Sequence, residues 1–231
     1  MTAKVVVLGG YGNFGRRICS ALAADGNIHI IVAGRSLAQA QALARQLGGH
    51  ASALAVDWRD PGFATALRDS GAQLLIHTCG PFQQQEYTVA EACIEAGCHY
   101  LDLADARGYV CGITALDSRA QARGLLLVSG ASSVPALAAA VVDRHLPAFA
   151  QLDSIRHAIS SGAVPPGIAT MRAVMGYVGQ SFTRWQGGRW QAVHGWQDLH
   201  ARRLPAPLGR RWLASCDVPD LELFPQRYPG V

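Results

Sequence analysis

The chain has 231 residues, of which 50% are hydrophobic and 16% are charged, a composition that excludes an intrinsically disordered protein and allows a sizeable core. The formal net charge of +4 is carried by arginine almost alone, since Lys4 is the only lysine, and so mild a charge does not predict a nucleic-acid-binding protein. The six cysteines and eight histidines show no metal-ligand spacing, so we expect reduced thiols and no metal site. No secretory leader or membrane-spanning apolar run is evident, so we expect a cytoplasmic protein without a membrane partner.

Apolar runs alternate with helical periodicities between residues 4 and 146, which predicts an α/β fold with a doubly wound parallel sheet and right-handed crossovers. The predicted strands are residues 4–8, 28–33, 53–56, 74–78, 100–103 and 125–128. Helices are predicted between them, the first with Phe14, Ile18 and Leu22 on one face, and the others at residues 36–47, 61–70, 89–96, 113–123 and 135–146.

Two of these helices have clear start signals. Ser36 is a predicted N-cap, with Gln39 completing a capping box, and Gly48–Gly49 ends the same helix. Asp60 followed by Pro61 predicts a second N-cap with proline at the first helical position.

The composition changes in the last third of the chain. Residues 148–231 hold more proline, and only residues 153–160 read as a clear strand. We therefore predict two domains, 1–147 and 148–231, the second being a smaller α+β domain on the substrate side. Its tryptophans favour core or interface positions and its arginine pairs favour exposed loop charge: Trp185, Trp190, Trp196, Trp212, Arg202–Arg203 and Arg210–Arg211.

A glycine motif follows the first predicted strand directly. Gly10-x-Gly12-x-x-Gly15 lies between that buried strand and a helix, the context of the dinucleotide-binding fingerprint of Rossmann domains. Gly10 permits a tight turn, Gly12 lets the backbone approach a pyrophosphate, and Gly15 allows close helix packing. The helix N-terminus then offers free N–H groups and positive potential to the phosphates. The alternative is a glycine turn with a purely structural role.

The end of the second strand indicates which dinucleotide is bound. NAD-selective proteins usually place Asp or Glu there, whereas this chain has Gly34, Arg35 and Ser36. An arginine fork and a hydroxyl suit the 2′-phosphate of NADP, so we expect NADP as the cofactor. The alternative is that Arg35 is a solvated arginine beside a helix.

Other candidate residues follow later strands, where ligands of such sheets bind. Asp57 either lines the adenine pocket or caps a turn, and Asp102 and Asp105 are candidates for substrate hydrogen bonding or proton transfer. His77 and His99 are interpreted as packed core histidines, and Cys79 as part of a cofactor-binding turn and not a nucleophile. The predicted cofactor-binding residues are Gly10, Tyr11, Gly12, Asn13, Phe14, Gly15, Arg35, Ser36, Asp57, Cys79, Gly80 and Pro81.

The motifs together resemble those of the saccharopine dehydrogenase-like oxidoreductases. The resemblance covers about residues 4 to 146 and is carried by the segments 7–15, 33–36, 79–82, 98–103 and 130–135. It implies an NADP-binding Rossmann domain followed by a substrate and dimerisation domain, and it does not imply saccharopine as the substrate. Relatives often carry Asp where this chain has Ser132, and they are commonly longer, so we expect an incomplete second domain.

We therefore predict an NADP-dependent oxidoreductase that transfers hydride to or from a small carbonyl, imine or activated alkene, and that forms a homodimer. No Tyr-x-x-x-Lys or His–Asp pair identifies its catalytic acid or base. A nucleotide-binding regulator or scaffold without turnover is the alternative.

Overall fold

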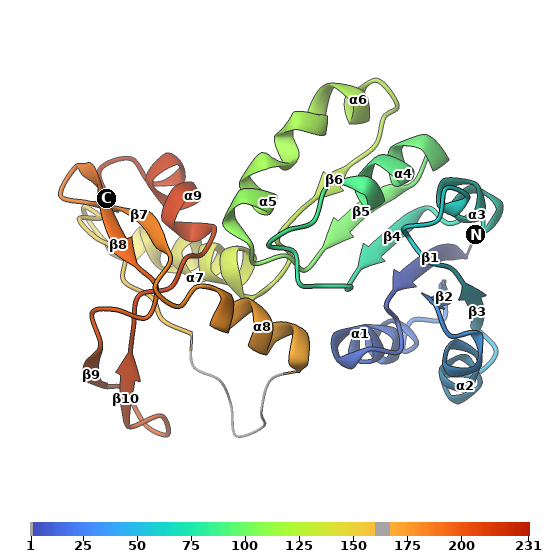
Figure 1. The fold of residues 1–231 in the computed structure, drawn as a ribbon, viewed down its shortest axis with the longest axis horizontal. Helices are drawn as coiled ribbons and strands as arrows, with labels where there is room; N and C mark the ends of the chain where they lie inside the picture. Colours follow the sequence, from blue (N-terminus) through green and yellow to red (C-terminus); the bar gives the residue numbers. More distant parts are fainter. Residues whose placement is uncertain (1, 160–166) are drawn as a thin grey trace. The chain divides into compact units, whose positions relative to one another are not determined.

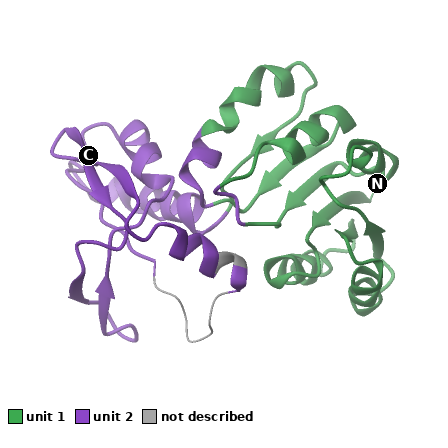
Figure 2. Ribbon diagram, viewed as in Figure 1, with its two compact units in different colours: residues 1–80, 84–104, 112–131 green, residues 81–83, 105–111, 132–231 purple. Residues whose placement is uncertain are grey.

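The computed structural model describes residues 2–159 and 167–231, which divide into two compact units (Figure 2). Unit 1 comprises residues 1–80, 84–104 and 112–131, and unit 2 comprises residues 81–83, 105–111 and 132–231. The division falls after Ala131, whereas the sequence pattern placed it after Pro147, and two short segments inside the first half belong to unit 2.

Unit 1 contains a six-stranded parallel sheet of order β3-β2-β1-β4-β5-β6 (Figure 1), so the predicted α/β fold is confirmed. The order reverses between β1 and β4, which is the switch point where such sheets bind ligands. The strands are β1 (Ala3–Leu8), β2 (Ile28–Gly34), β3 (Ala51–Ala55), β4 (Leu74–His77), β5 (His99–Asp102) and β6 (Leu127–Val128).

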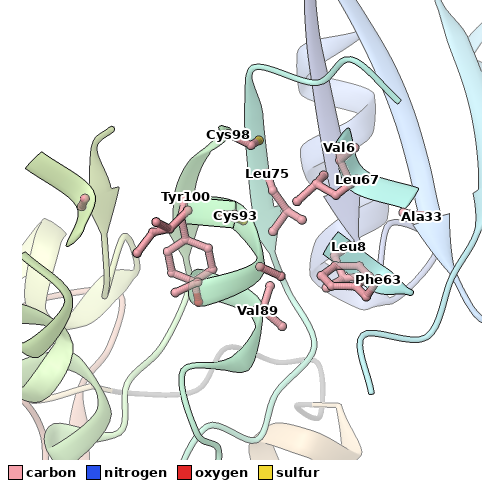
Figure 3. Packing of buried hydrophobic residues seen from close by; sticks show 14 of the residues in the cluster. Val6, Leu8, Ala33, Phe63, Leu67, Leu75, Val89, Cys93, Cys98 and Tyr100 are labelled. Atoms are coloured by element: carbon pink, nitrogen blue, oxygen red, sulfur yellow. The ribbon is translucent and has the colours of Figure 1, made fainter. Parts of the chain in front are cut away.

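Helices cover both faces of this sheet, because its central strands are apolar on both sides. One face packs on α1 (Asn13–Leu22) and α2 (Leu37–Leu47). The other packs on α3 (Phe63–Asp69), α4 (Thr88–Ala96) and α6 (Asp117–Gln121), which follows a 3₁₀ turn at 113–116. Figure 3 shows the core of this second face, including Val6, Leu8, Ala33, Phe63, Leu67, Leu75, Val89, Cys93, Cys98 and Tyr100.

Two helix starts differ from the prediction. Asp60 is not an N-cap, because α3 begins at Phe63 after Gly62, and Asp60 contributes only a carbonyl that accepts the Phe63 N–H. At α2, Ser36 Oγ accepts the Gln39 N–H at 3.4 Å as predicted. The Ser36 N–H, however, donates to a tyrosine hydroxyl, described below, in place of the Gln39 side chain.

Unit 2 contains short helices and two antiparallel hairpins. Its helical segments are α5 (Arg107–Gly112, whose last residue belongs to unit 1), an irregular turn at 133–137, α7 (Ala138–His145), α8 (Ile168–Gly176) and α9 (Asp220–Arg227). The hairpins are β7 (Ser181–Gln186) with β8 (Arg189–His194), and β9 (His200–Arg203) with β10 (Arg210–Leu213).

Three predictions for this later region need correction. The described part of the predicted strand, 153–159, forms no strand, since no described strand pairs with it, while residue 160 lies outside the described residues. The four arginines lie not in a loop but directly opposite one another in β9 and β10, Arg202 with Arg211 and Arg203 with Arg210. For three of the four tryptophans, which are exposed, the core position is wrong and the interface position stays a prediction: Trp190, Trp196 and Trp212.

Of the two predicted core histidines, His77 is fully buried, whereas His99 is exposed. His99 begins β5, and its Nδ1 accepts a hydrogen bond from the Leu126 N–H at 3.0 Å beside β6. It therefore links two strand ends at the surface.

Among the described helices, none combines the length and apolar character that a membrane span requires.

Candidate nucleotide-binding site

The loop between β1 and α1 is built from close backbone contacts that only glycine allows. Gly9 has the positive φ of the turn, +80°. The residue whose backbone conformation favours glycine is therefore Gly9, one position before the predicted Gly10. At Gly10 a Cβ would lie 2.9 Å from the Val7 carbonyl oxygen, and at Gly15 it would lie 2.2 Å from the Gly9 carbonyl oxygen. The loop and the first turn of α1 are thus packed backbone against backbone.

The N-terminus of α1 is uncapped. Gly12 is the N-cap residue, and no side chain accepts a hydrogen bond from the first helical turn. A ten-residue helix leaves its first N–H groups without intrahelical acceptors, and the helix dipole adds positive potential there. This end is therefore suited to an anion.

Phe14 does not pack in the core, contrary to the predicted apolar face of α1. Its side chain is 50% exposed, and the buried residues of the helix are Gly15 and Cys19. Because Gly15 faces the loop, Phe14 lies about a quarter turn around the helix and points away from it. Its predicted role at the cofactor stays a prediction.

Tyr11 joins the glycine loop to the end of β2. A Cβ at Gly34 would lie 2.7 Å from the Tyr11 ring, so the ring packs directly on the Gly34 backbone. The Tyr11 hydroxyl accepts a hydrogen bond from the Ser36 N–H at 2.9 Å. Gly34 therefore provides space for the tyrosine ring, and the ring holds the segment that presents Arg35 and Ser36.

Charged side chains that follow two strands, β2 and β3, act on Cys79. Arg35, Asp57 and Arg59 all act electrostatically on its thiol. In the described part of the chain Arg35 is exposed and forms no ion pair. Asp57 Oδ1 accepts the Arg59 N–H at 3.1 Å, so the turn-capping role that the sequence allowed for Asp57 is present.

Arg59 was missed by the sequence analysis. Its guanidinium lies 4.7 Å from the Trp58 ring centroid and 3.9 Å from Asp57, and its side chain is 62% exposed. The signal that could have found it is its position two residues after Asp57, beyond the end of the third strand.

Cys79 packs against the glycine loop. Its Sγ would lie 2.7 Å from a Cβ at Gly9, and its carbonyl oxygen accepts a hydrogen bond from Gln85 Nε2 at 2.7 Å. Burial raises the pKa of the Cys79 thiol to about 11, an effect that the nearby Arg35 only partly offsets. The thiol is protonated at neutral pH, which fits a packing role better than a nucleophilic one.

Asp102 has a structural role. It is fully buried, and its Oδ1 accepts hydrogen bonds from the N–H groups of Ala104 at 2.9 Å and Gly130 at 2.8 Å. It therefore fixes the loops after β5 and β6. Asp105 belongs to unit 2, where its Oδ1 accepts a hydrogen bond from Gln83 Nε2 at 3.3 Å and burial raises its pKa.

Eleven of the twelve predicted cofactor residues lie in unit 1, at the ends of β1, β2, β3 and β4, while Pro81 belongs to unit 2. An uncapped helix N-terminus and a close-packed glycine loop fit the diphosphate of a dinucleotide, and Arg35, which pairs with no described acid, lies at the end of β2. This fold and this arrangement define a nucleotide-binding α/β domain of the Rossmann type.

Comparison with known families identifies the domain further. Residues 5–128, more than half of the chain, match the family model described as the saccharopine dehydrogenase NADP binding domain. The chain belongs to this family, and the resemblance of its motifs is confirmed. No curated protein sequence matches the chain.

A solved structure shares its fold. Apo histidine-tagged saccharopine dehydrogenase (L-Glu forming) from Saccharomyces cerevisiae superposes with a TM-score of 0.65 at 18% identity, covering 99% of this chain and 53% of that one. The chain thus spans about half the length of the yeast protein. GenD2 from gentamicin A biosynthesis in complex with NAD is 25% identical over 56% of this chain and 34% of its own, with a TM-score of 0.42.

Proposed function

We propose that this protein is an NADP-dependent oxidoreductase that transfers hydride between the nicotinamide and a small carbonyl, imine or activated alkene. The observation that carries the cofactor preference is the end of β2, where Gly34 and Arg35 replace the acidic residue of NAD-selective proteins. An acid there would repel a 2′-phosphate, whereas an exposed arginine without an ion pair in the described residues attracts it.

Each part of the site has a role in this proposal. The first N–H groups of α1 bind the pyrophosphate, and Arg35 with Ser36 binds the 2′-phosphate. Arg59, stacked on Trp58, adds a second positive charge at the neighbouring strand end. Bound NADPH supplies the hydride, and the chain's residues orient it.

The family match supports an oxidoreductase, since it is to an NADP-binding domain of dehydrogenases. The yeast structure supports the fold alone, and because this chain spans about half of that protein, its substrate is not carried over.

Two measurements test the proposal on the full chain. Calorimetric titration should show tighter binding of NADPH than of NADH, and NADPH absorbance should fall when one member of a panel of imines, keto acids, aldehydes and enones is added. Equal affinity for both cofactors would contradict the NADP preference. Tight binding of NADPH with no oxidation across the panel would contradict the enzyme and favour the nucleotide-binding regulator.

A further inference from the structure

The hairpin of β9 and β10 in unit 2 has four arginines and no acid. Arg202 lies opposite Arg211 and Arg203 lies opposite Arg210, and all four side chains are exposed. None of them forms an ion pair with a described residue, and residues 199–216 contain no Asp or Glu. Like charges directly opposite each other destabilise an antiparallel pair of strands. An anionic partner would relieve this repulsion.

The turn of this hairpin is apolar. We call residues 200–213 the arginine hairpin and residues 204–208, with the sequence Leu-Pro-Ala-Pro-Leu, its tip. Residues 205–208 are exposed, as is Trp212 on the strand that follows the tip, at 64%. Strands β9 and β10 extend away from the other elements of unit 2 (Figure 1). The hairpin therefore presents an apolar end with positive charge directly behind it.

The backbone of the tip is suited to an apolar environment. Pro205 and Pro207 have no N–H group to satisfy. The Leu204 N–H donates to the Gly209 carbonyl oxygen at 2.8 Å, and the Leu208 N–H donates to the Pro205 carbonyl oxygen at 3.0 Å. An N–H group without an acceptor is costly to transfer out of water. This loop therefore costs less free energy to transfer than one whose N–H groups are all open.

The arginines lie on both faces of the hairpin, because successive side chains of a strand point to opposite faces. Arg203 and Arg210 share a face with Trp212, and the Arg210 guanidinium lies 5.7 Å from the Trp212 ring centroid. Arg202 and Arg211 lie on the other face. An open hollow at the hairpin is lined by three of these arginines and by no acidic residue. The arrangement suits a surface that bears many phosphates better than it suits a single anion.

The other hairpin of unit 2 lacks both features. Its strands β7 and β8 are joined by Gly187 and Gly188, and Arg184 and Arg189 each lie opposite a glutamine. Arg184 also donates to Gln186 Oε1 at 3.0 Å. Opposed arginines behind an apolar tip are thus particular to the arginine hairpin.

Two other occupants fit the hairpin less well. A nucleic acid would pair its phosphates with the arginines, but reading or stacking its bases needs hydrogen-bonding or aromatic side chains, and the tip has neither. A second copy of the hairpin would add to the uncompensated positive charge. An anionic lipid surface offers phosphates to the arginines and an apolar layer to the tip.

We propose that the arginine hairpin docks this protein on an anionic lipid bilayer. The tip enters the boundary between headgroups and acyl chains, the four arginines bind lipid phosphates and carboxylates, and Trp212 lies at the level of the headgroups. The sequence-based expectation of no membrane partner rested on the lack of a spanning apolar run, and a hairpin that binds at the surface needs no such run. The inference concerns unit 2 alone and does not rest on the proposed oxidoreductase function.

The test is sedimentation of the full chain with vesicles of phosphatidylcholine, either alone or mixed with phosphatidylserine. The protein should sediment with the mixed vesicles and much less with those of phosphatidylcholine alone. It should dissociate from the mixed vesicles as the salt concentration rises, because salt screens the attraction of the arginines to the lipids.

The contribution of the arginines is measured with a double variant, Arg203→Gln with Arg210→Gln. It should bind the mixed vesicles about 25-fold more weakly, since each arginine near an anionic surface contributes about a fivefold factor. The hairpin should stay folded, because the variant removes a pair of opposed like charges. The matched control, Arg184→Gln with Arg189→Gln, removes the same charge from the other hairpin and should bind almost as tightly as the wild type.

The contribution of the tip is measured separately. Leu208→Ser should weaken vesicle binding several-fold without a change of charge, whereas Leu126→Ser, at an exposed leucine of unit 1, should not. With mixed vesicles in excess, brominated phosphatidylcholine should quench the fluorescence of Trp212. The quenching should be lost in Trp212→Phe and kept in Trp190→Phe, which alters an exposed tryptophan of the other hairpin.

Three results would overturn the proposal. The first is sedimentation with neither kind of vesicle, and the second is binding of a single-stranded oligonucleotide in preference to anionic vesicles. The third is binding that is equal in Leu208→Ser, with quenching that persists in Trp212→Phe, since the contact would then not involve the tip. All the variants should keep wild-type affinity for NADPH, and a loss of it in the Arg203→Gln, Arg210→Gln variant would contradict the assignment of its effect to the hairpin.

Discussion

At the residue scale, Arg35 is the side chain whose role is most directly testable. We expect Arg35→Ala to weaken NADPH binding roughly ten- to a hundredfold, because a charge-assisted hydrogen bond contributes about 1.5–3 kcal/mol. NADH, which lacks the 2′-phosphate, should bind as before. Calorimetric titration of both nucleotides measures the effect, with Arg45→Ala as the control near the end of α2. A loss of the same size for NADH would contradict the assignment.

His77 provides a second prediction at this scale, on the pH dependence of stability. His77 is buried, and its Nδ1 lies 3.1 Å from the Tyr100 hydroxyl oxygen. Burial lowers the pKa of His77 from 6.5 to about 3. Between these two values the unfolded chain binds a proton that the folded chain does not, so stability falls as the pH falls.

From pH 7 to pH 5 this residue alone should reduce the free energy of unfolding by about 2 kcal/mol. Urea unfolding at both pH values should show a smaller reduction in His77→Gln, because its side chain does not titrate. The aspartates and glutamates contribute to both proteins and cancel in the comparison. Equal pH dependence in the two proteins would show that His77 becomes charged in the folded state.

Sequence patterns predicted which residues gather at the strand ends better than how they contact one another. The absence of an acid and the presence of Arg35 could be read directly, because both depend only on position after a strand. The contact of Tyr11 with Gly34 could not be predicted, since it depends on the packing of a ring against a residue 23 positions later in the chain. The hydrogen bond between Gln83 and the Tyr177 hydroxyl, which joins residues 94 positions apart, could not be predicted from the sequence either.

At the element scale, the approach of α1 to the glycine loop is the tightest contact of the nucleotide site. We expect Gly15→Ala to push the helix away from Gly9, since the new Cβ would lie 2.2 Å from a backbone oxygen that no rotamer can move. Such overpacking costs about 1–3 kcal/mol of stability. The displaced N–H groups should also bind NADPH more weakly.

Thermal unfolding and NADPH titration measure these two effects together. Gly26→Ala is the matched control, because a Cβ there meets nothing within 4 Å. Normal stability and normal affinity in Gly15→Ala would mean that the loop and the helix separate more easily than their packing indicates.

Elements that follow simple periodicity were predicted correctly in type and roughly in position. All six strands of the sheet are present, because each was predicted from a short, largely apolar run that needs no distant partner to be recognised. The predicted strand at 153–160 was not found in its described part, because alternation alone does not supply a pairing partner. His157 there packs instead on Phe224, with ring centroids 5.5 Å apart.

At the scale of the whole molecule, unit 2 exposes apolar surface that favours self-association. No residue of α7 is buried, and Leu137 and Val141 on and beside it are 60% and 51% exposed. We expect the protein to form a dimer whose dissociation depends on concentration, because large exposed apolar patches mark association sites.

Light scattering after size-exclusion chromatography should detect that dimer, and the double variant Leu137→Ser with Val141→Glu should be a monomer. Leu126→Ser, which alters an equally exposed leucine of unit 1, should leave the dimer intact. A wild-type monomer at all concentrations would contradict the prediction.

The division of the chain into units has a consequence for how this protein can diversify. The polypeptide passes between the units at residues 80/81, 83/84, 104/105, 111/112 and 131/132, so Gln83 and Asp105 are encoded within the stretch that builds the nucleotide domain. Tyr177 is encoded in the remaining hundred residues. A recombination that exchanges only the part of the gene after Ala131 would pass on Gln83 and Asp105 with the nucleotide domain and replace Tyr177, whose hydroxyl Gln83 contacts. Descendants of such an exchange would keep the nucleotide-binding fold of unit 1 while unit 2 diverged.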